Sequence, residues 1–221
     1  MRRSWRARVV LSTAAAVTER IRIGYGVLLL ALRPVAWAAK QVATLQHVSG
    51  NRLLLGVGTG NPVHGDIGWR AAGASFAERG RRTDEALAVL PDLVAGRTTT
   101  LPDGTEVALA PAADLPPVLV AGDGLRARRR AAAYADGWIA IGLGSDALPA
   151  TVSELTRFAD EYGRPTPAVT IVGPPLSDDP TRAAEQLAEY ADRGAERVII
   201  APNGPDRERR YEFAAKVKQA M

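Results

Sequence analysis

Cysteine is absent from the 221-residue sequence, which excludes disulfide bonds, thiolate nucleophiles and cysteine-ligated metals. Histidine occurs only twice, at His47 and His64, so no metal centre is expected. The apolar runs are far shorter than the roughly 20 residues that cross a bilayer. These absences predict a globular, cytoplasmic protein with no metal and no membrane partner.

Lysine is scarce as well, since 25 of the 28 basic residues are arginines, and the formal net charge is +4. The densest cluster, Arg126 with Arg128–Arg130, lies in one predicted amphipathic helix without the motifs of nucleic-acid binding. We therefore interpret the basic excess as solvated surface and expect no nucleic-acid partner. The arginine-then-apolar order of residues 1–17 is typical of a secretory signal, but Thr18-Glu19-Arg20 leads directly into a β-rich segment, which favours a packed helix.

Alternation of short β-rich runs with amphipathic stretches is the strongest structural signal. Six strand–helix units follow one leading helix, and parallel strands with right-handed crossovers make an α/β protein. The pattern fits an open doubly wound sheet and a barrel equally well, and no linker or repeat divides residues 1–221 into more than one domain. The predicted strands are residues 21–30, 53–57, 118–120, 138–141, 169–172 and 197–200, and the predicted helices are 34–50, 75–96, 125–135, 146–162, 180–193 and 205–219.

Local signals refine these boundaries. A proline and a glycine mark the two ends of helix 34–50. Ser75 and Glu78 have the spacing of a capping box at the start of the next helix. Residues 98–109 interrupt the alternation, and the turn Leu101-Pro102-Asp103-Gly104 between β-branched runs predicts a small hairpin insertion.

Two glycine-rich turns follow predicted strands, where both open α/β sheets and barrels place their sites. The first is Gly56-Val57-Gly58-Thr59-Gly60-Asn61. Its small residues let a flat ligand approach the backbone, and Thr59 and Asn61 offer hydrogen bonds. A tight turn that only needs positive φ angles explains the glycines equally well.

The second turn, Ala121-Gly122-Asp123-Gly124, enters a helix whose free N-terminal amides form an anion site. Arg126 and Arg128 follow in the same helix. Asp123 opposes a dianion unless its carboxylate caps the helix and points away from the ligand, and such capping is also the alternative to ligand binding.

Histidine and tryptophan supply weaker candidates. His64, in a long loop, suits an acid or base because imidazole exchanges protons near neutral pH, although a solvated loop histidine is more common. His47 lies where it can complement a helix C-terminus. Trp37, Trp69 and Trp138 suit either the wall of an aromatic cofactor site or core packing.

Taken in order, several stretches between roughly residues 9 and 205 resemble the luciferase-like monooxygenases. They are TERIRIG (18–24) leading into GVLLL (26–30) and Leu32-Arg33; KQVATL (40–45); SGNRL (49–53) with LGVGTG (55–60); FAERG (76–80) with DEAL (84–87); and ADGW (135–138).

This resemblance implies a TIM-barrel-like (β/α)8 fold that is incomplete, with about six βα units and a hairpin insertion, and so favours the barrel. It also implies that the family's first strand, first helix and second strand have no counterpart in this chain. Met1 is then either a misplaced gene start or the start of a reduced barrel. Six strands do not readily close a barrel of eight, and uncovered strand edges favour pairing with a second copy in a homodimer.

The resemblance further implies a cofactor, either reduced flavin mononucleotide (FMN) or the deazaflavin coenzyme F420, at the C-terminal ends of the strands. The GTGN sequence leans toward the deazaflavin branch, but Asn61 stands where sugar-phosphate dehydrogenases of that branch carry an acid, and an amide does not titrate. The resemblance places the cofactor ring against Gly26 and Val27 and near Thr59, Gly60 and Asn61, its phosphate on Gly122, Asp123 and Gly124, and Ile141 and Gly142 beside the phosphate.

The function implied is that of a luciferase-like oxidoreductase or monooxygenase, which acts on a small organic substrate by hydride transfer or oxygenation. No residue is assigned a catalytic role. The alternatives are a non-catalytic flavin-binding or dimerising remnant of that family, and an inert fragment.

Overall fold

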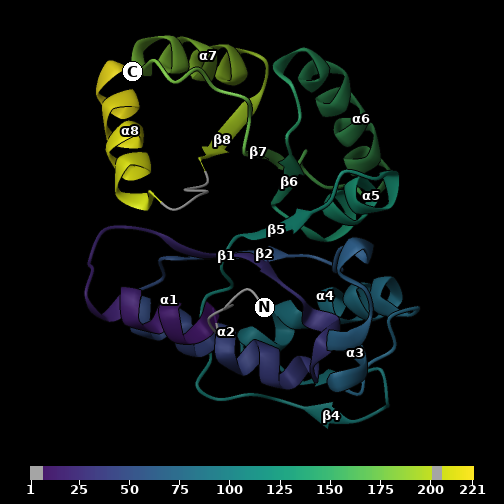
Figure 1. Ribbon diagram of the computed structural model, residues 1–221. Coiled ribbons are helices and arrows are strands. Elements are labelled where there is room, and N and C mark those ends of the chain that lie inside the picture. Colours follow the sequence, from purple (N-terminus) through teal and green to yellow (C-terminus); the bar gives the residue numbers. More distant parts are fainter. Residues whose placement is uncertain (1–6, 201–205) are drawn as a thin grey trace. The chain divides into compact units, whose positions relative to one another are not determined.

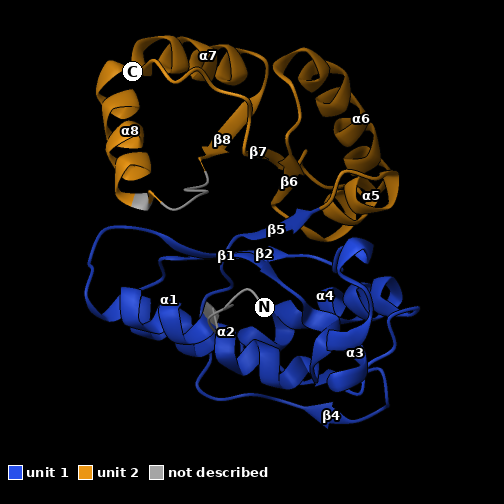
Figure 2. Ribbon diagram, viewed as in Figure 1, with its two compact units in different colours: residues 1–121 blue, residues 122–221 orange. Residues whose placement is uncertain are grey.

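The computed structural model describes residues 7–200 and 206–221 (Figure 1). Strands and helices alternate through both ranges, and the chain groups into two compact units, residues 1–121 and 122–221 (Figure 2). Every sheet pairing described below between strands of the six βα units is parallel, so the predicted α/β class is confirmed. The single-domain interpretation of residues 1–221 stays a prediction.

The first unit is built on three parallel strands in the order β1-β2-β5. Leu53, Leu55 and Val57, which share one face of β2, are fully buried, and Leu54 on the other face is half-buried. The 3₁₀ turns η1 and η2 and a short antiparallel hairpin, β3 with β4, complete the unit and confirm the predicted insertion. The elements are α1 (Ala7–Ala16), β1 (Ile23–Leu28), η1 (Leu30–Leu32), α2 (Val35–Ser49), β2 (Leu53–Val57), η2 (Pro62–His64), α3 (Ile67–Ala71), α4 (Arg79–Val94), β3 (Thr99–Thr100), β4 (Glu106–Val107) and β5 (Val118–Ala121).

Helix α2 begins and ends where the sequence predicts. Pro34 occupies the N-cap position, and Gly50 closes the helix in the left-handed conformation, with φ 61° and ψ 50°. The Gly50 N–H donates to the carbonyls of Gln46 and His47, which satisfies backbone groups that the helix end leaves unpaired.

Helix α4 departs from its prediction at the N-terminus. The Ser75 Oγ accepts a hydrogen bond from the Glu78 N–H (3.3 Å), but the helix begins only at Arg79. The Glu78 carboxylate accepts from the Arg81 guanidinium at 2.5 Å, so only one half of the predicted capping box forms. Competition from a nearby arginine explains the difference, because both partners of a carboxylate–guanidinium pair are charged, whereas a backbone amide is neutral.

The second unit contains three parallel strands in the order β6-β7-β8. Its core places Trp138, Phe158 and Ile171 at near-zero exposure, and the guanidinium groups of Arg129 and Arg157 lie 4.5 and 4.7 Å from the Phe158 ring centroid. The last strand lies earlier than the predicted 197–200. The elements are α5 (Leu125–Tyr134), β6 (Gly137–Ile141), η3 (Ser145–Ala147), α6 (Leu148–Glu161), β7 (Ala168–Val172), α7 (Pro180–Asp192), β8 (Ala195–Ile199) and α8 (Arg207–Ala220).

Two predicted helices extend past the described residues. The leading helix, expected within residues 1–17, is α1, and residues 1–6 of that segment lie outside the described residues. The start of the last predicted helix, at residue 205, lies outside them too. Within residues 7–200 and 206–221, each helix falls short of the length and apolarity of a membrane span.

A single guanidinium joins four elements of the first unit. Arg52, at the start of β2, donates from Nε to the Ser49 carbonyl at 2.5 Å. Its two Nη groups reach the carbonyls of Ala15, Thr18 and Ile21 at 2.7–2.9 Å, and the Thr18 hydroxyl at 3.0 Å. All five N–H donors are therefore used, four of them on the C-terminal end of α1 and the segment after it. The cation also complements the negative end of the α1 dipole.

We predict that Arg52→Lys lowers the free energy of unfolding by about 2–4 kcal/mol, because an ammonium cannot reproduce the five-donor fork and leaves half-buried carbonyls unsatisfied. Chemical denaturation measures the loss, and hydrogen exchange should show faster opening of α1 than of α2. Arg22→Lys, at an exposed position one strand away, is the matched control. Equal stability of the two variants would contradict the role of Arg52.

Candidate functional site

The end of β1 carries the first two predicted cofactor residues. A register shift between Tyr25 and Leu28 places two residues of β1, Gly26 and Val27, against one of β2. The Gly26–Val27 peptide bond is cis. A Cβ on Gly26 would meet no atom within 4 Å, so the backbone is open at this strand end. Flat ligands approach a backbone most closely where side chains are missing, which fits the prediction for Gly26.

Val27 lies against the loop that follows β2. A Cβ on Gly58 would lie 2.5 Å from the Val27 Cγ2, a distance that a β-branched side chain cannot easily relieve. The structure therefore brings Val27 and the start of the first glycine turn into direct contact, and glycine is required at position 58 for packing.

The rest of that turn has its own internal partners. Gly60 has φ +82°, and a Cβ there would lie 3.1 Å from the Trp69 ring. The Asn61 Oδ1 accepts from the Val63 N–H (3.0 Å) and caps η2. Thr59 is half-buried beside them. A positive φ thus explains Gly60, and the Asn61 side-chain oxygen is already engaged in local structure.

The tryptophans and histidines differ in their exposure and in their contacts. Trp69 is 4% exposed and packs edge-on against Phe76, with ring centroids 5.8 Å apart, so it supports the Gly60 turn from behind. Trp37 is 66% exposed. His64 is exposed in its loop. The His47 ring reaches the Ala112 carbonyl (Nε2···O 2.9 Å), so it fastens the loop before β5.

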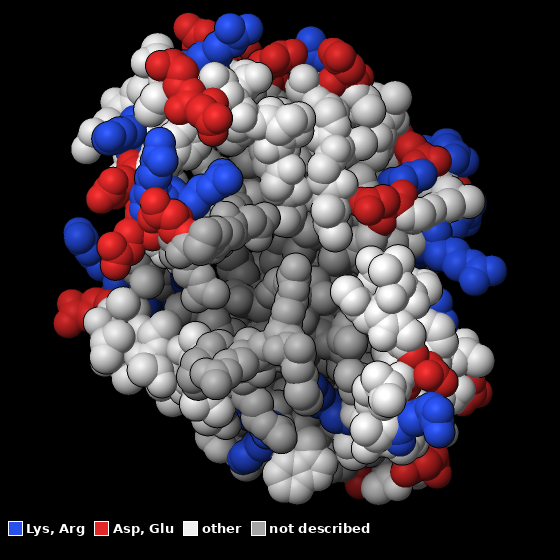
Figure 3. Space-filling view, in the orientation of Figure 1, with Lys and Arg blue, Asp and Glu red and all other residues white. Residues whose placement is uncertain are grey.

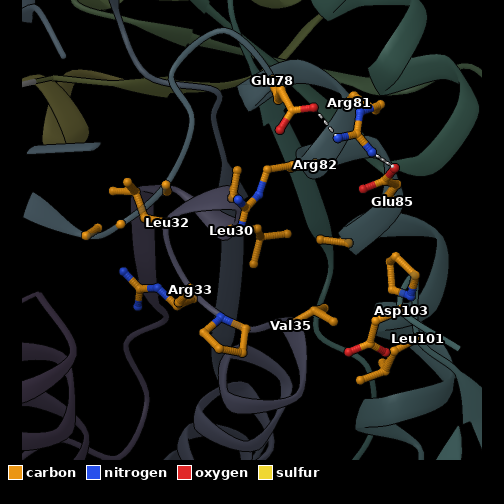
Figure 4. A pocket seen from close by; sticks show the side chains of 17 residues that line it. Leu30, Leu32, Arg33, Val35, Glu78, Arg81, Arg82, Glu85, Leu101 and Asp103 are labelled. Atoms are coloured by element: carbon orange, nitrogen blue, oxygen red, sulfur yellow. Dashed lines mark hydrogen bonds and ion pairs between the residues drawn. The ribbon is translucent and has the colours of Figure 1, made fainter. Parts of the chain in front are cut away.

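The first unit also has a cavity of about 530 Å³, and we call it the α4 groove (Figure 4). It is bordered by η1, the start of α2, the first turns of α4 and the tip of the β3–β4 hairpin. Figure 4 shows Arg81 held between Glu78 and Glu85, with both N···O distances at 2.5 Å. Arg82 also lines the groove, and among the described residues no carboxylate lies within ion-pair distance of it. The hairpin was predicted only as an insertion, and its Leu101–Asp103 tip forms part of this wall.

In the second unit, the Gly122 turn is held rigidly. Gly122 has φ +135°, and its carbonyl accepts from the Trp138 indole N–H at 2.8 Å. Its N–H donates to the Ile139 carbonyl at 3.1 Å. A Cβ on Gly122 would lie 2.9 Å from the Ala127 Cβ. Trp138 is thus a buried support for the turn, a role that the sequence did not indicate because the two residues are 16 positions apart.

The Asp123 carboxylate does not cap α5, so the capping alternative does not hold. Its Oδ1 accepts from the Ile141 N–H at 3.0 Å, which ties the turn to the end of β6. The N-cap of α5 is Gly124, and no side chain of the described residues accepts a hydrogen bond from that helix start. The backbone amides of Leu125 and Arg126 therefore stay open to a ligand, whereas the Ala127 N–H donates to the Gly124 carbonyl at 2.9 Å.

Ile141 and Gly142 lie next to Asp123, as predicted for neighbours of the turn. Ile141 is 64% exposed, and Gly142 has φ +65° with its N–H on the Val172 carbonyl (2.9 Å). The two predicted arginines differ. Arg128 is engaged, by the Asp123 carbonyl at 2.6 Å and by Glu154 at 2.5 Å. Arg126 is exposed on the first turn of α5.

Charged side chains of both signs are interspersed on the face drawn in Figure 3. Many arginines in the second unit have carboxylate partners, such as Arg129 with Glu161 at 3.2 Å and Arg193 with Glu189 at 2.9 Å. Within the described ranges, no group of three or more His, Asp or Glu residues has the arrangement of a metal site.

The fold and these strand-end turns define an α/β protein of the kind that places its site at the C-terminal ends of parallel strands. Residues 4–221 match the family model of the luciferase-like monooxygenases. The chain belongs to the luciferase-like monooxygenase family, as the sequence resemblance implied.

Related sequences match part of this chain. Uncharacterised proteins of Mycobacterium tuberculosis and Mycobacterium bovis are 37% identical over 164 residues, which is 72% of this chain and 56% of each relative. The chain therefore spans about half the length of these relatives. The 4-hydroxyprotoasukamycin monooxygenase of Streptomyces nodosus is 37% identical over 86 residues, or 39% of this chain and 22% of that protein.

Solved structures agree on the fold. The coenzyme F420-dependent tetrahydromethanopterin reductase of Methanopyrus kandleri matches with a TM-score of 0.75 at 16% identity, over 96% of this chain and 86% of that one. A monooxygenase from Streptomyces bottropensis matches with a TM-score of 0.75 at 19% identity, over 97% and 82%. An F420-dependent secondary alcohol dehydrogenase matches with a TM-score of 0.65 at 19% identity, over 98% and 76%. These matches confirm the TIM-barrel-like class.

We predict that Gly122→Ala lowers the free energy of unfolding by about 2–3 kcal/mol, because the new Cβ adds backbone strain at φ +135° and a clash with Ala127. Gly124→Ala is the matched control, since a Cβ there meets no atom within 4 Å and φ is −81°. Urea denaturation of both variants compares them, and a stable Gly122→Ala protein would show that the turn is not strained.

Proposed function

We propose that this protein is an oxidoreductase of its family that binds reduced FMN or coenzyme F420 and acts on a small organic substrate. The observation that carries the proposal is the turn Gly122-Asp123-Gly124, which leaves the first amides of α5 uncapped among the described residues. Uncapped amides at the positive end of a helix dipole suit the phosphate that both cofactors carry.

In the second unit, Gly122, Asp123 and Gly124 are proposed to hold the phosphate. Gly124 presents the helix amides, and Arg126 on the exposed face adds a positive charge. The Asp123 carboxylate is fixed on the Ile141 N–H, so it acts as a brace for the turn. Ile141 and Gly142, at the end of β6, are proposed as neighbours of the same group.

In the first unit, Gly26, Val27, Thr59, Gly60 and Asn61 are proposed to contact the cofactor ring. The open space at Gly26 leaves the backbone accessible, and the contact of Val27 with Gly58 adds an apolar surface, which suits a flat aromatic ring. The α4 groove of the same unit offers a substrate-sized space with Arg82 among its lining side chains.

When bound, either cofactor supplies hydride transfer, and reduced FMN also activates dioxygen. The residues of this chain position the ring and exclude water from it. No catalytic acid or base is assigned, because Asn61 does not titrate and His64 is exposed. The lack of an assigned acid or base supports a second candidate function, that of a non-catalytic flavin-binding or dimerising protein. Turnover of any substrate by the cofactor-loaded protein would exclude it.

We propose a single domain that works in the cytoplasm, without nucleic-acid or membrane partners and as a homodimer.

We expect equilibrium titration with FMN and with coenzyme F420, followed by absorbance and fluorescence, to give a dissociation constant below about 1 mM for one of the two. Binding of one cofactor alone would identify the branch of the family. Failure of both to bind at millimolar concentration would refute the proposed function.

The phosphate assignment has its own test. Asp123→Asn keeps an oxygen acceptor for the Ile141 N–H but removes the negative charge, so we expect cofactor affinity to rise about threefold or more. Asp192→Asn removes the same charge from an exposed position on α7 and serves as control. An Asp123→Asn protein with unchanged stability and unchanged affinity would argue against phosphate at this turn.

A further inference from the structure

A second cavity, of about 430 Å³, lies between α1, β1 and the start of α2, and we call it the β1 cavity. Four polar side chains line it: Arg8 from α1, Tyr25 from β1, Arg33 from the segment after η1, and Gln41 from α2. The rest of the wall is aliphatic, from residues 27–29 and Leu32. Its size is that of a small-molecule site.

Two cations share this space without an anionic partner. Among the described residues, no carboxylate lies within 4.0 Å of Arg8 or Arg33, and neither residues 1–6 nor 201–205 contain an Asp or Glu. The Arg33 guanidinium has one long contact, from Nη1 to the Gln41 Oε1 at 3.4 Å. Burial and then the charge of Arg8 lower the pKa of Arg33, so the two guanidinium groups repel each other in a partly desolvated space.

Tyr25 adds a neutral donor to the pair. Its side chain is buried, with 6% exposure, and the described residues give its hydroxyl no hydrogen-bond partner. Burial raises the pKa of Tyr25, while Arg33 and Arg8 act in the opposite direction, so the phenol is protonated at neutral pH. A protonated phenol beside two guanidinium groups offers O–H and N–H donors and no negative charge, which is the inventory of an anion site.

We propose that the β1 cavity binds an organic carboxylate with a short aliphatic body. Arg8 and Arg33 bind the carboxylate, Tyr25 donates to it, and the aliphatic wall packs against the hydrocarbon. A fully hydrated inorganic anion would leave that wall in contact with water, so the apolar share of the cavity favours an amphiphilic acid. Because side chains alternate along β1, Tyr25 lies on the opposite face from Gly24 and Gly26. Arg8, Tyr25 and Arg33 are therefore not among the residues proposed for the cofactor, while Val27 belongs to the walls of both sites, and Leu32 and Arg33 also line the α4 groove.

Isothermal titration calorimetry of the full chain with sodium octanoate tests the proposal. We expect a dissociation constant below about 1 mM. Octan-1-ol, which has the same hydrocarbon without the charge, should bind at least tenfold more weakly, and inorganic phosphate at constant ionic strength should bind more weakly than octanoate. Absence of octanoate binding at 10-fold higher concentration, or equal binding of octanol, overturns the proposal, and tighter binding of phosphate overturns the choice of a carboxylate.

Variants locate the site. Arg8→Gln and Arg33→Gln should each weaken octanoate binding at least tenfold, and Tyr25→Phe about threefold. Arg210→Gln, which removes an exposed arginine of α8, should bind octanoate like the parent protein. Circular dichroism checks that each variant folds. Unchanged octanoate affinity in folded Arg8→Gln and Arg33→Gln proteins would overturn the assignment. Titration of Arg8→Gln with FMN and F420 distinguishes loss of the carboxylate site from loss of the cofactor site, since we expect this variant to bind the cofactor with the affinity of the parent protein.

Discussion

The guanidinium of Arg52 is the interaction on which the first unit depends most. It holds the end of α1, the segment before β1 and the end of α2 in one place, and its own carbonyl accepts from the Ile23 N–H at the start of β1 (3.0 Å). β1 is the edge strand of this unit, bonded to β2 on one side. An edge strand that has one sheet neighbour needs other restraints, and Arg52 supplies them. The fork geometry of arginine matters here because each of its donors has a different acceptor.

A few side-chain hydrogen bonds also fix the turn that we propose for the phosphate. The Trp138 indole fixes the Gly122 carbonyl, and the Asp123 carboxylate fixes the end of β6, so two side chains immobilise a segment that has little side-chain bulk of its own. Glycine gives that segment close access to a ligand but also maximal freedom in the unfolded chain. Preorganisation by these two hydrogen bonds reduces what a ligand must order when it binds.

Features that depend on neighbouring residues followed directly from the sequence. The limits of α2 come from Pro34 and Gly50, β2 was predicted residue for residue, and the hairpin turn at residues 101–104 has the composition that its geometry requires. The family resemblance added the barrel class, which periodicity alone did not decide. Both strand-end turns were found from their glycines, of which Gly60 and Gly122 occupy backbone conformations that other residues avoid.

Features that depend on distant partners were missed or misassigned. Capping of α5 by Asp123 was an open alternative, because a carboxylate before a helix often caps it, but the carboxylate accepts from the Ile141 N–H 18 residues later. The Glu78 carboxylate accepts a hydrogen bond from the Arg81 guanidinium and forms none of the expected capping bonds at the start of α4. The β1 cavity had no sequence signal at all, because Arg8, Tyr25, Arg33 and Gln41 come from four separate segments and meet only after α1 has packed on β1 and α2.

The packing of α1 on β1 and α2 connects Arg52 with both proposed ligand sites. Arg52 holds α1, α1 carries Arg8, and Val27 belongs at once to the wall of the β1 cavity and to the surface over Gly58. A carboxylate bound in the cavity would contact one side of the bulged segment, and a cofactor ring the other. Since Val27 is stiff at χ1 and touches Gly58, a shift forced by one ligand cannot be absorbed by rotation of that side chain. Any coupling between the two ligands must then pass through the backbone of residues 26–28, and by linkage it would act equally in both directions.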